Sequence, residues 1–252
     1  MNKIKIGFKI VVYFWKIASN LPRFLRLRSF FSSQVLSLMW NKKPLYISLP
    51  SIYFEGGQAS KKRSSLPGDV RRDIPWVRPH DSDAAVNIKI LLSDFVDEVN
   101  IVSDENIDEK IICENIVCIG GQSNYIFEQL VIKKNYIAPL KYEIDSSKGI
   151  DGYNNPNQNQ SYMSNDTSYS YGLFALIKNP YAEDKRIIFI SGLNADITLG
   201  ITKTLKNNMK KFAIKLKRIK YRDSGFYCIV KFAKKGDPKF PIFDDLFAGS
   251  IS

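Results

Sequence analysis

Two glycine-bearing turns carry the groups best suited to binding an anion. Each turn follows an apolar run of strand length, at 115–119 and 186–190, and precedes a stretch with helical character. Glycine allows a ligand to approach the backbone closely, and the first N–H groups of a helix are free to bind a negative charge. We therefore expect a phosphate-bearing ligand here, although glycine also serves turn geometry alone. The predicted ligand-binding residues are Gly120, Gly121, Ser123 and Asn124 in the first turn, and Gly192, Asn194 and Thr198 in the second.

Neither turn identifies the ligand. The sequence lacks both the six-residue glycine pattern of dinucleotide-binding folds and the phosphate loop that ends in Lys-Ser or Lys-Thr. Ligands of open α/β sheets bind outside the carboxyl ends of the strands, so the two turns would face one ligand if their strands are parallel neighbours. The cofactor is unknown at this stage.

A second group of candidates could carry proton transfer. The only histidine, His80, lies in the segment 78–83 together with two carboxylates. A carboxylate can orient an imidazole for proton transfer, so His80 and Asp83 are candidate catalytic residues. Asp83 is equally explained as a first-turn acid that favours the helix dipole. Glu55, which follows the first strand, is a comparable candidate.

The sequence predicts no metal centre. A single histidine excludes a histidine-based zinc site, and the three cysteines lack the spacing of metal ligands. The cysteines are expected to be reduced, which predicts a cytoplasmic protein, with a peripheral position at the inner membrane as an option.

The elements that must position these residues alternate between strands and helices. The predicted strands are 44–50, 98–102, 115–119, 171–177, 186–190 and 226–232, and the predicted helices are 83–92, 125–130 and 196–208. Alternation of this kind favours a parallel sheet covered by helices, and the turn-rich segment 179–184 favours one antiparallel pair. We therefore predict a Rossmann-like α/β fold with a mixed, mostly parallel sheet and flanking helices.

An N-terminal arm precedes this domain. Residues 1–42 are predicted to form a basic, apolar helical arm, and residues 43–252 the α/β domain, with mobile loops near 58–80 and 145–170. The apolar stretches of the arm are too short for a spanning helix or a signal peptide. The arm could pack on its own domain or on a partner chain, or it could lie on an anionic membrane.

The positive charge is concentrated in two segments. Residues 1–43 and residues 203–222 each hold nine Lys or Arg and no acid, and removing these 18 charges from the net +12 leaves −6 for the rest. Such asymmetry favours an acidic partner surface, which could be a protein, an anionic membrane or nucleic acid.

Three motifs in a fixed order resemble a known group of proteins. Strand 115–119 with Gly-Gly-x-x-Asn, then the segment 171–180, then strand 186–191 with Ser-Gly resembles poorly characterised bacterial Rossmann-like domains of signalling and defence proteins. The resemblance covers roughly residues 44–205, and the sequence departs from it where 196–198 replaces the frequent Gly-Thr of the second turn. It implies a nucleotide-type ligand or an interaction role.

The expected function is therefore a nucleotide-type or phosphorylated-ligand binding module in a bacterial signalling or defence complex. The basic arm would dock this module to a partner or a membrane. Two alternatives remain open. One is a nucleotide-cleaving hydrolase, and the other is a subunit that associates with nucleic acid without sequence specificity.

Overall fold

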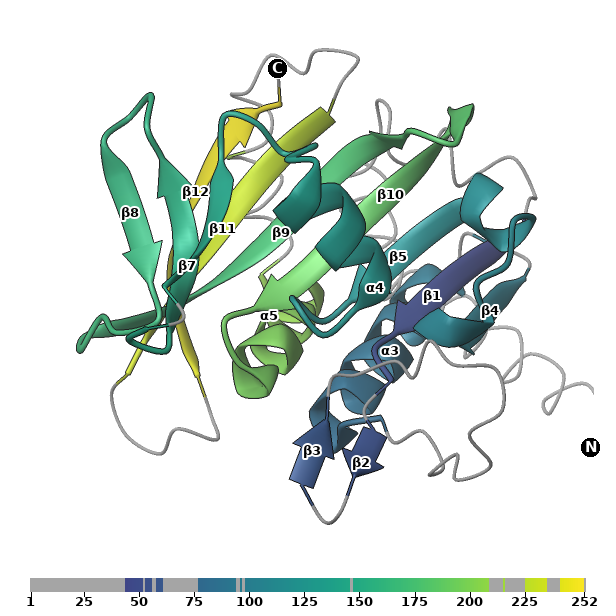
Figure 1. Ribbon diagram of the computed structural model, residues 1–252, viewed down its shortest axis with the longest axis horizontal. Helices are drawn as coiled ribbons and strands as arrows, with labels where there is room; N and C mark the ends of the chain where they lie inside the picture. Colours follow the sequence, from purple (N-terminus) through teal and green to yellow (C-terminus); the bar gives the residue numbers. More distant parts are fainter. Residues whose placement is uncertain are drawn as a thin grey trace, which may run out of the picture.

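A seven-stranded mixed sheet forms the centre of the protein (Figure 1). The computed structural model describes residues 44–51, 53–55, 58–60, 77–93, 96, 98–145, 147–208, 215, 225–234 and 241–251. The strand order is β12-β11-β9-β10-β5-β1-β4. The bounds are β1 (Leu45–Leu49), β4 (Val99–Ser103), β5 (Asn115–Ile119), β9 (Tyr169–Asn179), β10 (Ala182–Gly192), β11 (Gly225–Ala233) and β12 (Ile242–Ser250).

The sheet has a parallel half and an antiparallel half. Strands β4, β1, β5 and β10 are parallel to one another, whereas β9, β11 and β12 continue the sheet in antiparallel pairs. Strand β5 lies in the middle of the parallel half and is buried along its whole length. Its sequence, Asn-Ile-Val-Cys-Ile, has the continuous apolar character of a strand that is covered on both faces.

Different elements cover the two faces of this sheet. Helices α3 (Pro79–Leu92) and α5 (Ala195–Asn207) pack on one face and on each other, and they enclose the first apolar core. The other face carries α4 (Tyr125–Phe127), which continues as the wider turns of η3 (Glu128–Lys133), and a second sheet. That three-stranded antiparallel sheet consists of β6 (Lys141–Asp145), β7 (Ile150–Asn155) and β8 (Gln160–Met163). The remaining described elements are the hairpin β2 (Tyr53–Glu55) and β3 (Gln58–Ser60) and the 3-10 turns η1 (Asp104–Asn106) and η2 (Ile111–Cys113).

The prediction of a Rossmann-like α/β fold with flanking helices is wrong. In the part of the chain that the structure describes, strands predominate, and the α-helices whose bounds are described are α3, α4 and α5. Three of the seven strands are antiparallel, and much of one face is covered by a small sheet instead of helices. The physical reason is that the connection from β5 to β10 contains only the short helical segment of α4 and η3 and otherwise consists of strands β6 to β9, and antiparallel neighbours among these strands need no crossover helix.

Part of the predicted mobile loop 145–170 forms the second sheet. Strands β7 and β8 lie inside this interval, and Tyr153 and Tyr162 are buried against the main sheet. Polar residues dominate the composition of this interval, and each of the two strands has a single buried tyrosine, so the sequence shows no continuous apolar or alternating pattern there. Whether the connections in this interval are mobile stays a prediction.

Several predicted features lie outside the described residues. They include the arm 1–42, most of the loop 58–80, and nearly all of the basic segment 203–222 beyond α5. No described helix is both long enough and apolar enough to cross a membrane.

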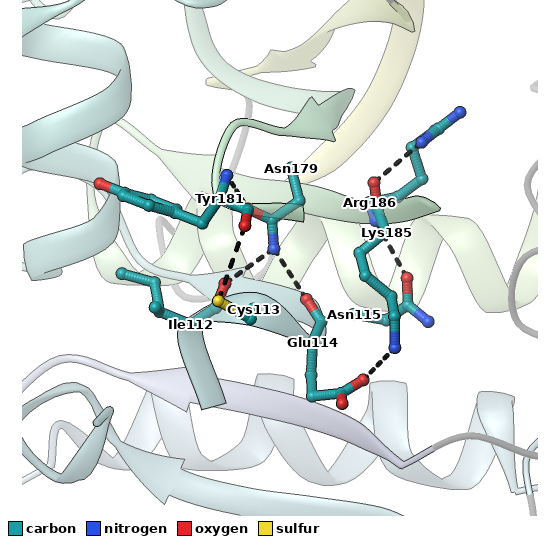
Figure 2. A network of polar contacts seen from close by, with 8 residues as sticks. All are labelled: Ile112, Cys113, Glu114, Asn115, Asn179, Tyr181, Lys185 and Arg186. Carbon is teal, nitrogen blue, oxygen red and sulfur yellow. Dashed lines mark hydrogen bonds and ion pairs between the residues drawn. The ribbon is translucent and has the colours of Figure 1, made fainter. Parts of the chain in front are cut away.

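A polar network fastens the β9–β10 hairpin to the start of β5 (Figure 2). The Asn179 side-chain amide donates to the carbonyl oxygen of Glu114 over 2.9 Å. Lys185 forms an ion pair with the Glu114 carboxylate, and its side chain is only 8% exposed. The Asn115 side-chain oxygen accepts a hydrogen bond of 3.0 Å from the backbone N–H of Arg186. This network fixes the starts of β5 and β10 relative to each other. Because the two strands are paired in parallel, their carboxyl ends also lie next to each other.

Candidate ligand-binding site

The two glycine turns lie side by side at one end of the sheet. Strands β5 and β10 are parallel neighbours in which Ile119 pairs with Ile190, and the Gly120 N–H donates to the Ile190 carbonyl over 2.9 Å. A Cβ added to Gly121 would lie 2.7 Å from Ser191 Oγ, so the turns touch each other. We call this end of the sheet, where β4, β1, β5 and β10 finish, the carboxyl edge.

The chain leaves the carboxyl edge toward opposite faces of the sheet. After β1 and β10 it runs to α3 and α5 on one face, and after β5 it runs to α4 on the other. Such a change of direction between neighbouring strands is where open sheets commonly bind ligands. Here Pro50 packs directly against Gly120, since a Cβ added to Gly120 would lie 3.1 Å from Pro50 Cγ. A ligand would therefore lie outside the turns and not between the strands.

The side chain of Asn124 is fully engaged within the protein. Its Oδ1 accepts a hydrogen bond of 3.0 Å from the N–H of Ile126 and so caps α4. Its Nδ2 donates to the carbonyl of Ser48 at 3.3 Å, to Ser48 Oγ at 3.1 Å and to the carbonyl of Ile119 at 3.1 Å. Asn124 is completely buried. The side chain therefore holds β1, β5 and α4 together, and its amide has no group left for a ligand.

The second turn is organised in a similar way. Asn194 Oδ1 caps α5 by accepting from the N–H of Ile197 over 2.9 Å. Thr198 Oγ1 accepts from the N–H of Gly192 over 2.9 Å. A Cβ added to Gly192 would lie 2.4 Å from Thr198 N, so glycine is required for this close approach. The side chains of Asn194 and Thr198 thus shape the turn.

Backbone N–H groups remain free in both turns. Among the described residues, none accepts a hydrogen bond from the backbone N–H of Gly121, Gln122, Ser123, Asn194, Ala195 or Asp196. All six residues are at least partly exposed. The carboxyl edge therefore offers amide donors from two adjacent turns, and those of the second turn stand at the positive end of the α5 dipole.

The structure pairs His80 with a residue that sequence reasoning did not select. His80 lies in the first turn of α3, and its Nδ1 is 3.4 Å from Asp196 Oδ1 in the first turn of α5. The two side chains are 46% and 31% exposed. Since 115 residues separate them in the chain, only the packing of α3 against α5 could reveal the pair.

The other two candidate acids are not brought to His80. Asp83 is exposed on α3, and no hydrogen bond or ion pair joins its side chain to His80 or to any other described residue. Glu55 is the last residue of β2, where it pairs with Gln58, and the direction of its side chain is not described.

A buried acid, Asp81, lies next to His80; it is one of the two carboxylates of the segment 78–83, but it was not selected as a candidate site residue. Asp81 is 2% exposed, and burial raises the pKa of its carboxyl to about 6, while the charges of Arg78 and His80 oppose this rise. No described residue donates a hydrogen bond to its carboxylate. The described side-chain atoms that are fully enclosed without a hydrogen-bond partner belong to other residues. A carboxyl group with a perturbed pKa is a common feature of functional sites.

A second buried acid, Asp104, has a structural role. It follows β4 at the carboxyl edge, where its carboxylate accepts hydrogen bonds from the N–H of Ser51 at 3.1 Å and of Tyr125 at 2.8 Å. It therefore braces the loop after β1 against the start of α4.

The described residues at the carboxyl edge include no disulfide and no group of metal ligands. The three cysteines are free, and Cys118 and Cys228 are buried. Within the described ranges, no three His, Cys, Asp or Glu side chains are grouped as metal ligands. Comparison with known proteins adds no candidate, because no family model and no curated protein matches the sequence.

Proposed function

We propose that the protein binds a phosphorylated, nucleotide-type ligand at the carboxyl edge of β5 and β10. The observation that carries this proposal is the set of free backbone N–H groups in the two adjacent turns, 121–123 and 194–196. Backbone amides at a helix N-terminus are well suited to phosphate, because they donate hydrogen bonds and the helix dipole favours negative charge.

The charges around the edge make ligand binding dependent on pH. Asp196 and Asp81 oppose an anion when they are ionised, whereas Arg78 and a protonated His80 attract it. Because burial raises the pKa of Asp81 to about 6, this carboxyl carries less negative charge at pH 6 than at pH 8, and phosphate binding is expected to be stronger at pH 6.

The proposed docking of this module to a partner or a membrane is supported by the sequence alone. Docking of the module to a protein partner or an anionic membrane, in a signalling or defence complex, is supported by the charge of residues 1–43 and 203–222. Of the second segment, Lys203 and Lys206 are exposed on α5, and Lys215 pairs with Asp245 over 3.8 Å. Association with nucleic acid, which would use the same positive charges, stays an alternative.

The substitution Asn194→Asp tests ligand binding without removing the cap of α5. Aspartate caps a helix as well as asparagine does, so the thermal stability without ligand should stay within a few degrees of the wild type. The added negative charge beside the free amides should weaken binding of ADP or inorganic phosphate at least about tenfold. Isothermal titration calorimetry at pH 6 measures the affinity for ADP and for phosphate. The melting temperature with and without each ligand provides a second readout.

Asn207→Asp is the matched control for this experiment. It adds the same charge at an exposed position in the last turn of α5, about 18 Å from the first turn by helix rise. It should leave the affinity for phosphate unchanged. Equal affinity of the wild type and Asn194→Asp, or no binding of phosphate and nucleotides by either, would refute the proposed function.

A further inference from the structure

The His80–Asp196 pair joins the N-terminal turns of two helices at the carboxyl edge. Helix α3 follows β1 and α5 follows β10, and the two helices pack together, so that their first turns meet. The contact of 3.4 Å is made by His80 Nδ1. When the imidazole is neutral, an Nδ1–H donated to the carboxylate leaves Nε2 as a proton acceptor.

The same turn of α5 supplies free N–H groups. Asp196, which contacts His80 through its side chain, follows Asn194 and Ala195 in the second set of amides. A phosphate held by these amides would therefore lie close to the imidazole. The His80 side chain is 46% exposed, so water can also reach it.

Asp81 provides an independent indication that this place is used. It is a carboxyl group beside His80 that is 98% buried and accepts no hydrogen bond from any described residue. Burying such a group costs stability. Buried carboxyl groups that interact with specific charged neighbours, as Asp81 does with Arg78 and His80, are common where proteins bind or transform ligands.

We propose that His80 is the general base of a phosphodiester hydrolysis at the carboxyl edge, and that Asp196 is its positioning residue. The inference rests on the proposed function, because the free amides must hold the diester. It goes beyond that function in assigning a reaction and a catalytic residue.

The step is balanced with water as the only co-reactant. His80 Nε2 takes a proton from a water molecule while the water oxygen attacks phosphorus. The bond between phosphorus and one ester oxygen breaks, and the leaving oxygen receives the proton back from the imidazolium. The products are an alcohol and a phosphate monoester, and no oxidation or reduction takes place.

Hydrolysis of bis(4-nitrophenyl) phosphate by the full chain tests this proposal. The wild type should release 4-nitrophenol from the diester. His80→Gln should lower kcat at least about 100-fold. Asp196→Asn should lower kcat about tenfold with an equal or lower KM, because an anion near the amides is removed while the imidazole loses its orientation. Lys89→Gln, exposed in the last turn of α3, is the control that should retain full activity.

The possible failures are distinguishable. If phosphate binds and Asn194→Asp weakens it, but the wild type hydrolyses the diester no faster than His80→Gln, the assignment of His80 is overturned and the binding function stands. If phosphate does not bind at all, both proposals fail. If His80→Gln and Asp196→Asn lose activity with a raised KM and an unchanged kcat, His80 binds the ligand and is not the base.

Discussion

Replacing Asn124 with aspartate is expected to destabilise the protein by about 4 kcal/mol, which is a large share of the stability of a typical domain. The Asn124 amide donates to Ser48 and to the carbonyl of Ile119 in a completely buried position. Aspartate keeps the oxygen that caps α4, but it presents a second oxygen to these acceptors. The result is either a buried charge or a protonated carboxyl with too few donors, and both are costly.

The comparison that isolates this effect uses the same change at the other helix cap. Asn194→Asp is exposed and should alter the free energy of unfolding by no more than about 0.5 kcal/mol. Asn124→Ala loses both the cap and the donors, and we expect a loss of about 3 kcal/mol. Urea unfolding of the three variants measures these differences. Similar small losses for Asn124→Asp and Asn194→Asp would contradict the role of the Asn124 amide.

Replacing Asp81 with asparagine is expected to stabilise the protein at pH 7. The pKa of Asp81 is raised to about 6 in the folded protein, chiefly because the carboxyl is buried. In the unfolded chain an aspartate has a pKa of about 3.9. Between these two values the folded state binds a proton more tightly than the unfolded state, so the contribution of Asp81 to the free energy of unfolding falls as the pH rises. The difference of about two pH units corresponds to roughly 3 kcal/mol.

The test is the difference in unfolding free energy between the wild type and Asp81→Asn as a function of pH. This difference should change by roughly 2 kcal/mol between pH 4 and pH 7, in the direction that favours the variant at neutral pH. Asp83→Asn, an exposed change two residues further along α3, should cost less than about 1 kcal/mol at pH 7. A difference for Asp81→Asn that does not vary with pH would show that the carboxyl is not perturbed by burial.

The parallel half of the sheet could be predicted from the sequence because its signals are local. The run 115–119 is apolar throughout and ends in glycines, and it coincides with β5. In the antiparallel half, the predicted antiparallel pair of 171–177 with 186–190 is confirmed as β9 and β10, and the predicted strand 226–232 lies in β11, but β12 was not predicted. Strand β12 contains Asp244 and Asp245, which are exposed on an edge strand, so it lacks a continuous apolar run. Strands β7 and β8 of the second sheet were also not predicted, because most of their residues are polar, although Tyr153 and Tyr162 are buried.

The candidate site could be located from the sequence, but the roles of its residues could not be assigned. Glycine turns after two strands indicated the carboxyl edge, and the pairing of β5 with β10 brings these turns together. An asparagine just before a helix is also a common cap, and Asn124 and Asn194 both act as caps. The approach of Asp196 to His80 depends on packing between helices that are distant in sequence, so no local pattern could reveal it.

The central claim is that amides of two neighbouring turns bind the phosphate of a ligand, and titration of the ¹⁵N-labelled full chain with inorganic phosphate and with ADP tests it most directly. The account predicts saturable changes in the amide resonances of residues 121–123 and 194–196, with the same residues affected by both ligands. Resonances of these six amides that stay unchanged at saturation, or changes confined to the lysines of the basic segments, would contradict it.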